Sequence, residues 1–133
     1  MISFSIALAL EVRNYAIHWV PVEDQGTRQI YFDENYHKRE EQFSYVMWLV
    51  DFTSDGADAE RDAIDPQAKS IEYANQNDCR LHGTRKTFYI AYDDHMQQGK
   101  ALAQKNIVPP WQDVQPGTLQ ERIWNRACAS ATQ

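Results

Sequence analysis

The two cysteines are the residues whose chemistry the sequence constrains most directly. Cys79 and Cys128 lie far apart in the chain. They cannot form a Cys-x-x-Cys redox motif, and two thiols alone do not complete a four-ligand zinc site. Two alternatives remain, a single disulfide or two unrelated buried thiols that pack as small apolar side chains. A disulfide closing a loop of about 50 residues would contribute roughly 4 kcal/mol in the chain-entropy model.

Histidines and carboxylates form no recognisable catalytic or metal-binding pattern. Only Asp93-Asp94-His95 places ligand types close together, and a polar turn explains that trio. The stretch from Asp55 to Glu60 lacks the alternating ligands and the terminal glutamate of an EF-hand loop. No glycine-rich phosphate loop, Gly-x-Ser-x-Gly elbow or His-Glu-x-x-His helix is present. We predict a non-enzyme without metal or cofactor; a hydrolase with unrecognised carboxylates would need a concave pocket.

Basic and aromatic side chains are the better candidates for a binding role, because arginine and aromatic residues are common at protein interfaces. The formal net charge of -6 opposes binding to nucleic acid or to anionic lipid, so we expect a protein partner. The alternative is that the basic residues simply solvate the end of a strand. The candidate binding residues are Lys38, Arg39, Arg80, Arg85, Lys86, Tyr89 and Tyr92.

Aromatic residues outside this set have two readings. Trp19, Trp48 and Trp111 can serve as ligand platforms, but in a chain this short we expect most tryptophan side chains to pack in the core. Tyr31 is a further candidate for the open face or the edge of the sheet.

The elements that would position these residues are mostly strands. The segment 42–52 is apolar on both faces, which is typical of a central strand. Residues 53–67 are rich in Asp, Gly, Ala and Pro, which predicts a long acidic loop or a short surface helix. Residues 100–108 form either a last strand or an irregular edge. The other predicted strands are residues 15–22, 28–33, 70–75 and 84–92.

One helix is predicted near the C-terminus. Thr118 and Glu121 have the spacing of a capping box, in which the Thr118 hydroxyl accepts from the Glu121 amide. Apolar residues then recur at helical spacing at Leu119, Ile123 and Ala127, and this stripe would lie on the sheet. Cys128 is directed inward by the same periodicity, where Cys79 can meet it.

The chain is long enough for one domain, which we place at residues 15–133. Its predicted class is α+β, an antiparallel sheet of about five to six strands with a C-terminal helix packed on it. Residues 1–14 contain an apolar run that is either a truncated signal peptide or a leading segment of the fold. No later segment approaches the roughly 18 apolar residues of a membrane helix, so no membrane span is predicted.

An ordered set of motifs then suggests a family. Asn77-Asp78-Cys79-Arg80 precedes the strand with Tyr89 and Tyr92. Trp111 is followed by Pro116-Gly117-Thr118, and Ala127-Cys128 closes the set. Upstream, Tyr31-Phe32-Asp33 stands where such proteins often carry Tyr-Tyr-Asp. In this order the motifs resemble the surface-adhesin protein E family, loosely from Trp19 to Cys128. The structural residues of the match are Trp111, Pro116, Gly117, Thr118 and Glu121.

The resemblance implies an antiparallel sheet with a packed helix, a Cys79–Cys128 disulfide and a tendency to form homodimers. It also implies a secreted, extracytoplasmic protein of the periplasm or cell surface that adheres to host matrix proteins such as vitronectin and laminin. Two departures favour an alternative, an interaction or accessory protein of a bacterial envelope system without a host ligand. No lipobox cysteine stands near the N-terminus, and the basic segment ending at Lys38-Arg39 is followed by Glu40-Glu41.

Overall fold

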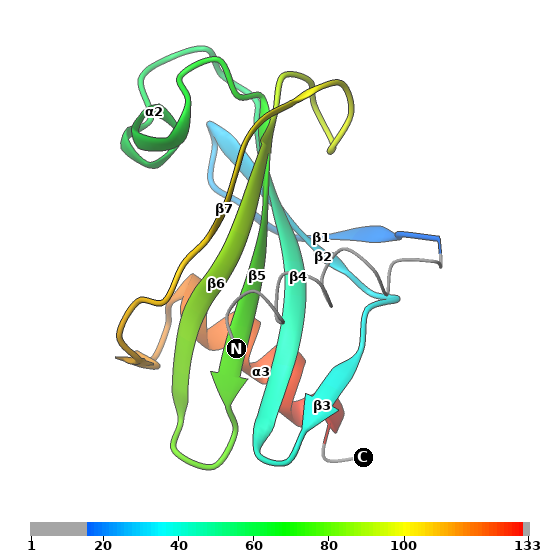
Figure 1. The fold of residues 1–133 in the computed structure, drawn as a ribbon, viewed down its shortest axis with the longest axis vertical. Coiled ribbons are helices and arrows are strands. Elements are labelled where there is room, and N and C mark those ends of the chain that lie inside the picture. The colour runs from blue at the N-terminus through cyan, green and yellow to red at the C-terminus, as the bar shows by residue number, and fades with distance from the viewer. Residues whose placement is uncertain (1–15, 132–133) are drawn as a thin grey trace.

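The computed structural model of the chain describes residues 16–131, and the predicted leading segment 1–14 lies outside them. Within these residues the chain forms one antiparallel sheet of eight strands and two helices (Figure 1). The α+β class with a C-terminal helix is therefore confirmed. Six strands lie side by side in the order β1 (Trp19–Asp24), β2 (Arg28–Asp33), β4 (Phe43–Phe52), β5 (Ser70–Asp78), β6 (Gly83–Tyr92) and β7 (Ala101–Asn106).

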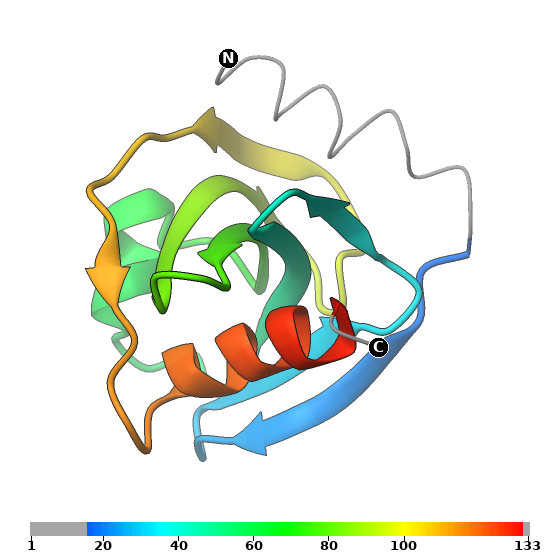
Figure 2. The same ribbon diagram turned by 90° about the horizontal axis from the view of Figure 1, so that it is seen from below.

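The sheet curls around its C-terminal helix. The helix α3 (Leu119–Ala131) lies across the lower half of one face, and Figure 2 shows the strands wrapping around it. We call this side of the sheet the concave face. The short helix α2 (Ala59–Ile64) lies near the other end of the strands. No helix in residues 16–131 is long and apolar enough to cross a membrane.

Both faces of β4 are covered, as the sequence predicts for a central strand. On the concave face Val46, Trp48 and Val50 pack with the α3 residues Ile123 and Ala127. On the opposite face Met47 packs with Phe88 and Ile90 of β6, together with Tyr36. Burying one large apolar side chain stabilises a fold by roughly 1.5–3 kcal/mol, so β4 contributes to the core through both of its faces.

Two strands were not predicted, and several ends differ from the prediction. The short strands β3 (Lys38–Glu40) and β8 (Gln112–Asp113) pair with β4 and β6. Their residues are polar and carry no alternation, so only backbone pairing to a neighbour reveals them. The first strand begins at Trp19 rather than Tyr15, and β5 continues to Asp78 rather than ending at Asn75. The loop 53–67 contains α2, and residues 100–108 contain a regular strand, β7.

Hydrogen bonds and a disulfide fix α3 at both ends. At the N-terminal end, the Thr118 hydroxyl accepts from the Glu121 amide at 3.3 Å. The Glu121 carboxylate reaches back and accepts from the amide of Gly117 at 3.1 Å. Near the C-terminal end, Cys128 is bonded to Cys79, with 5.4 Å between their Cα atoms. The helix therefore cannot shift along the sheet without breaking one of these contacts.

Candidate functional site

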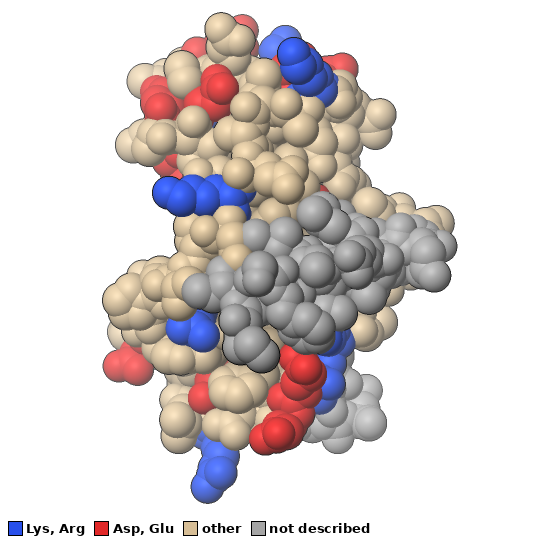
Figure 3. All heavy atoms as spheres, in the orientation of Figure 1, with Lys and Arg blue, Asp and Glu red and all other residues tan. Residues whose placement is uncertain are grey.

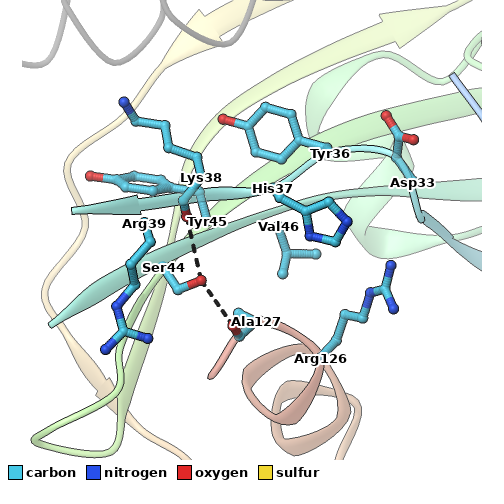
Figure 4. A pocket seen from close by; sticks show the side chains of 10 residues that line it. All are labelled: Asp33, Tyr36, His37, Lys38, Arg39, Ser44, Tyr45, Val46, Arg126 and Ala127. Atoms are coloured by element: carbon cyan, nitrogen blue, oxygen red, sulfur yellow. Dashed lines mark hydrogen bonds between the residues drawn. The ribbon is translucent and has the colours of Figure 1, made fainter. Parts of the chain in front are cut away.

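A basic cleft of about 330 Å³ lies between β3, the first half of β4 and the last turns of α3 (Figure 4). It contains the two predicted binding residues of β3, Lys38 and Arg39, and brings them near His37 and Arg126. Arg126 comes from α3, far from β3 in the sequence. The cleft is therefore formed by tertiary packing and not by one basic segment.

Hydrogen bonds fix several of the residues that line the cleft. The turn between β3 and β4 has Glu41 in the left-handed backbone region, with a φ of 55°. The Arg39 Nε atom donates to the Glu41 carbonyl at 2.6 Å, which ties the arginine side chain to the turn. The Ser44 hydroxyl lies 2.9 Å from the Ala127 carbonyl oxygen and joins β4 to α3. Because the serine side chain is small, a hydroxyl and no bulky group lines the cleft at this point.

Arg39 and Arg126 are the two arginines that line the cleft, one from β3 and one from α3. In Figure 4 the Arg39 and Arg126 side chains lie on the α3 side of β3. Arg126 donates to the Glu34 carbonyl at 3.3 Å, and Arg39 Nη1 is 3.7 Å from the Cys79 sulfur. Within residues 16–131 neither guanidinium forms an ion pair with a carboxylate. Arg39 is exposed and Arg126 is half-buried, so an acidic group can approach both of them. The carboxylate in the cleft lining is that of Asp33, which is buried.

Lys38 has a different environment from Arg39, because neighbouring strand residues point to opposite faces. Its ammonium lies 3.7 Å from the Glu40 carboxylate and 5.7 Å from the centre of the Tyr45 ring. The Tyr45 hydroxyl donates to Glu40 at 3.2 Å. Burial, and next the negative charge of Glu40, raise the pKa of Tyr45, so its phenol stays protonated near neutral pH. The positive charge of Lys38 is partly offset by the neighbouring Glu40 carboxylate.

The other predicted basic residues lie outside the cleft lining. Arg80 is exposed in the turn between β5 and β6. Arg85 stacks on the Trp111 ring, 4.2 Å from its centre, and donates to Gln76. Lys86 faces the concave side and pairs with Glu60. Arg85 and Lys86 are thus engaged by specific partners and are not merely a solvated end of a strand.

The aromatic predictions were partly wrong. Trp48 is buried in the core, but Trp111 is 39% exposed and lies on the Phe43 ring beside Gly83. Trp111 follows two prolines in a segment that pairs with β6 only through β8, so it packs on the outside of the sheet. Tyr89 and Tyr92 are half-buried against the two core clusters. They do not join Arg39 in one binding surface.

Metal binding finds no support in the described part of the chain. No group of three or more His, Cys, Asp or Glu side chains in residues 16–131 is placed to hold a metal ion. The acidic stretch 55–60 instead begins α2, where the Asp58 side chain caps the helix by accepting from the Arg61 amide. Figure 3 shows acidic side chains gathered over α2, whereas basic ones are spread singly over the visible face.

Two cleft residues escaped the sequence-based prediction. Arg126 precedes the buried Ala127 on α3 and carries no periodic signal of its own, and its nearest partner is the backbone of Glu34. His37 is exposed and adjoins Lys38 in the sequence, so the basic run 37–39 was the available signal. The sequence could not show that Arg126 and His37 line the same cleft, because this depends on how α3 packs on the sheet.

Comparisons with known proteins agree with the fold. The sequence model of the family described as surface-adhesin protein E matches residues 19–129. The crystal form II structure of Haemophilus influenzae protein E has a TM-score of 0.61 and 14% identity, covering 90% of this chain and 100% of that one. Protein E from non-typeable Haemophilus influenzae gives a TM-score of 0.58 and 14% identity, with 88% of each chain covered. No curated protein matches the sequence.

Proposed function

Because the chain belongs to the surface-adhesin protein E family, we propose that it is an exported bacterial module that binds a protein partner through its basic cleft. The observation that carries this proposal is that Arg39 and Arg126 line one cleft and that neither forms an ion pair with a carboxylate among residues 16–131. The function is adhesion or interaction, and no step of catalysis is assigned to any residue.

The chemistry of the cleft favours an acidic segment of the partner. A guanidinium group presents several donors in a plane and binds carboxylates in pairs of parallel hydrogen bonds. The whole chain has a net charge of -6, so a strongly acidic partner is repelled at long range. Attraction is therefore local, and we expect a short acidic stretch rather than a uniformly acidic surface to dock here.

Candidate host ligands are vitronectin and laminin, which come from the family resemblance. The test is binding of the purified full chain to each immobilised protein, compared with the double variant Arg39→Gln/Arg126→Gln. We expect at least a tenfold loss of affinity in the double variant and no change in Lys105→Gln, an exposed lysine on β7. Retention of no protein on either matrix ligand would remove the host-adhesin role and leave the fold intact.

The alternative partner is a bacterial envelope protein. The acidic net charge favours it, since such a partner would not need to bind the extended basic surface expected for matrix adhesion. Envelope extract of the parent bacterium is passed over the immobilised full chain and, in parallel, over the double variant. A single protein enriched by the natural chain and lost with the variant would support this alternative.

Export and oligomeric state are part of the same proposal. The Cys79–Cys128 bond supports an oxidising compartment, the periplasm or the cell surface, because structural disulfides rarely persist in the cytosol. Intact mass of protein from the native bacterium, alkylated without prior reduction, tests this directly. Two alkylated thiols would contradict it. Sedimentation analysis tests the homodimer that the family resemblance implies.

A further inference from the structure

The outer edge of β3 is open among the residues that the structure describes. β3 pairs with β4 alone and lies off the path of the six long strands. Figure 1 shows β3 at the lower right margin of the sheet, and in Figure 4 it borders the basic cleft. A strand edge of this kind presents main-chain donors and acceptors with which an extended segment of another chain can pair.

The pairing register of β3 shows which main-chain groups point outward. The turn between β3 and β4 has two residues, so Glu40 and Phe43 close it as a hydrogen-bonded pair. The next pair along the strands is Arg39 and Ser44. Because hydrogen-bonded and non-hydrogen-bonded pairs alternate, the Arg39 amide and carbonyl point away from β4.

Contacts on the other side of β4 agree with this alternation. The Ser44 carbonyl accepts from the Asn77 side chain of β5 at 3.3 Å. The Gln42 carbonyl accepts from the Cys79 amide, just after β5, at 2.8 Å. Both carbonyls are thus directed toward β5 and away from β3. Arg39, which stands opposite Ser44, therefore offers its N–H and its C=O at the outer edge.

The Arg39 side chain makes this edge selective for acidic residues. It projects to the α3 side of β3, where Arg126 lies beneath His37 (Figure 4). Neither guanidinium forms an ion pair with a carboxylate among residues 16–131. On an added strand, the residue opposite Arg39 points to the same face, with about 5 Å between Cβ atoms. A carboxylate at that position therefore meets the guanidinium.

The positions of the two arginines favour acidic residues that are two positions apart. Side chains at i and i+2 of a strand share a face and are separated by roughly 7 Å. One carboxylate then lies at Arg39, and the next on the same face lies toward Arg126. Asp33, the carboxylate of the cleft lining, is buried and accepts from the amides of His18 and Asn35 at 3.2 and 3.1 Å. It lies inside the fold and not at the edge.

The other edge strands of the described sheet lack these features. β1 contains Pro21, which has no amide to donate, and its register shifts between Pro21 and Glu23. β7 does not line the basic cleft, and Lys105 is its single basic residue. Charged side chains on an edge ordinarily discourage strand addition. At β3 they exclude segments without complementary charge and admit an acidic one.

We propose that the basic cleft binds its partner by strand addition, in which an extended acidic segment pairs with the outer edge of β3. The pairing is antiparallel, which is the commoner and slightly more stable arrangement. The residue opposite Arg39 exchanges two main-chain hydrogen bonds with it, and acidic side chains at alternating positions lie at Arg39 and Arg126. This inference rests on the proposed protein-binding role of the cleft, and it specifies the conformation and the acid spacing of the bound segment.

The first test uses a blocked, fluorescein-labelled peptide with the sequence Thr-Val-Asp-Val-Asp-Val-Thr. Its control, Thr-Val-Val-Asp-Asp-Val-Thr, has the same composition and charge but places its two acids on opposite faces of a strand. Fluorescence anisotropy with the folded full chain should show that the first peptide binds at least tenfold more tightly. Equal affinities, or no saturable binding of the first peptide, would overturn the proposal.

N-methylation of the first peptide tests the main-chain pairing. Methyl groups on the two aspartate nitrogens remove the donors that face β3 and should weaken binding at least tenfold. A methyl group on the valine between them, whose N–H faces away from β3, should change the affinity less than twofold. Binding that survives methylation of the aspartates would overturn the proposal.

Amide hydrogen exchange locates the pairing on the natural chain. Saturation with the unmodified peptide should slow exchange of the Arg39 amide at least tenfold. The Lys38 amide is the internal control, because the register already pairs Lys38 with Tyr45. An Arg39 amide that exchanges at the same rate in the complex would rule out strand addition at this edge.

Variants separate this inference from the protein-binding role itself. Arg39→Gln and Arg126→Gln should each weaken binding of the alternating peptide about fivefold, whereas Lys105→Gln should leave it unchanged. Binding that depends on both arginines, but not on acid spacing or methylation, would overturn strand addition and leave the basic cleft as a binding site. A dimer of the full chain that the peptide dissociates would place a second copy at this edge and overturn its assignment to a partner.

Discussion

The two ends of α3 present basic side chains in different ways. At the C-terminal end, Arg39 and Arg126 are bonded to backbone carbonyls and keep their full charge. At the N-terminal end, Arg28 and Lys86 both pair with Glu60, Arg28 also pairs with Asp58, and both cations lie close to aromatic rings. The same residue types therefore differ in availability, since an arginine without an ion pair can bind an acidic segment whereas a cation already paired with a carboxylate has its partner within the fold.

The two ends of α3 are also held in place by different contacts. A disulfide fixes the C-terminal end of α3 to the end of β5, whereas the N-terminal end depends on a cap and on apolar packing. Covalent and non-covalent anchors should therefore respond differently to substitution. The predictions below test this difference.

The largest effect is expected from Cys128→Ser. Loss of the Cys79–Cys128 bond should reduce the free energy of unfolding by roughly 2–5 kcal/mol, because the unfolded chain is no longer constrained by the loop. Urea denaturation measures the change, and the natural chain treated with a reductant is the matched control. Partner binding at the basic cleft should weaken as well, since Arg126 lies two residues from the lost bond. An unchanged midpoint would mean that the disulfide contributes nothing to stability.

The next largest effect is expected from Trp48→Phe in the core on the concave face. Phenylalanine keeps an aromatic ring on Tyr73 but leaves the buried Asn75 oxygen without its donor. An unsatisfied buried acceptor costs about 1–3 kcal/mol, which thermal denaturation would detect. The control is Trp111→Phe, which removes part of an exposed stack and should cost less. A larger loss of stability in Trp111→Phe than in Trp48→Phe would contradict the assignment of Trp48, rather than Trp111, to the core.

Glu60→Gln should destabilise the fold in a pH-dependent way. The pKa of Glu60 is lowered in the folded chain, so its contribution is present above its ordinary value of 4.5 and is lost as the pH falls through the folded value. We expect a loss of roughly 1–2 kcal/mol at about pH 7 that disappears near about pH 3. Urea denaturation at both pH values measures it. A difference that persists or grows in acid would contradict the assignment.

Thr118→Ala should remove the cap at the N-terminal end of α3. The expected cost is about 1 kcal/mol, because the Glu121 amide loses its acceptor. The control is Thr27→Ala in an exposed turn, which should change stability much less. Equal melting temperatures for the two variants would show that the cap is unimportant.

The smallest effect is expected from Lys38→Gln. Lys38 lies across β3 from Arg39 and pairs with Glu40 at a half-exposed position, a kind of contact worth about 0–1 kcal/mol. Partner binding and the melting temperature should both stay close to those of the natural chain, whereas Arg39→Gln should weaken partner binding. Equal losses of partner binding in Lys38→Gln and Arg39→Gln would contradict this prediction. They would mean that the partner contacts both side chains, although these point to opposite faces of β3.

Much of the fold was predictable because its signals are local. Alternating and continuous apolar runs marked the long strands, and the Thr118–Glu121 spacing marked the start of α3. The strands β3 and β8 were missed because polar residues pair there through the backbone alone. The partner of Cys128 came from the family resemblance rather than from the spacing of the cysteines.

The candidate sites were less predictable than the fold. Lys38 and Arg39 were named together as binding residues, but strand alternation sends them to opposite faces. Lys86 was grouped with Arg85, yet it pairs with Glu60 from the acidic stretch that the sequence predicted as a long loop or a short surface helix. Basic residues could be recognised from the sequence, whereas their partners could not.

The sequence by itself determined the class of the fold, the central strand, the start of the last helix and the family. These properties depend on residues that are neighbours in the chain or on an ordered set of motifs. Only the tertiary structure decided that Arg126 joins Arg39, and that Glu60 serves both Arg28 and Lys86. The physical reason is that electrostatic partners are selected by distance in space, and this distance depends on how the sheet curls around α3.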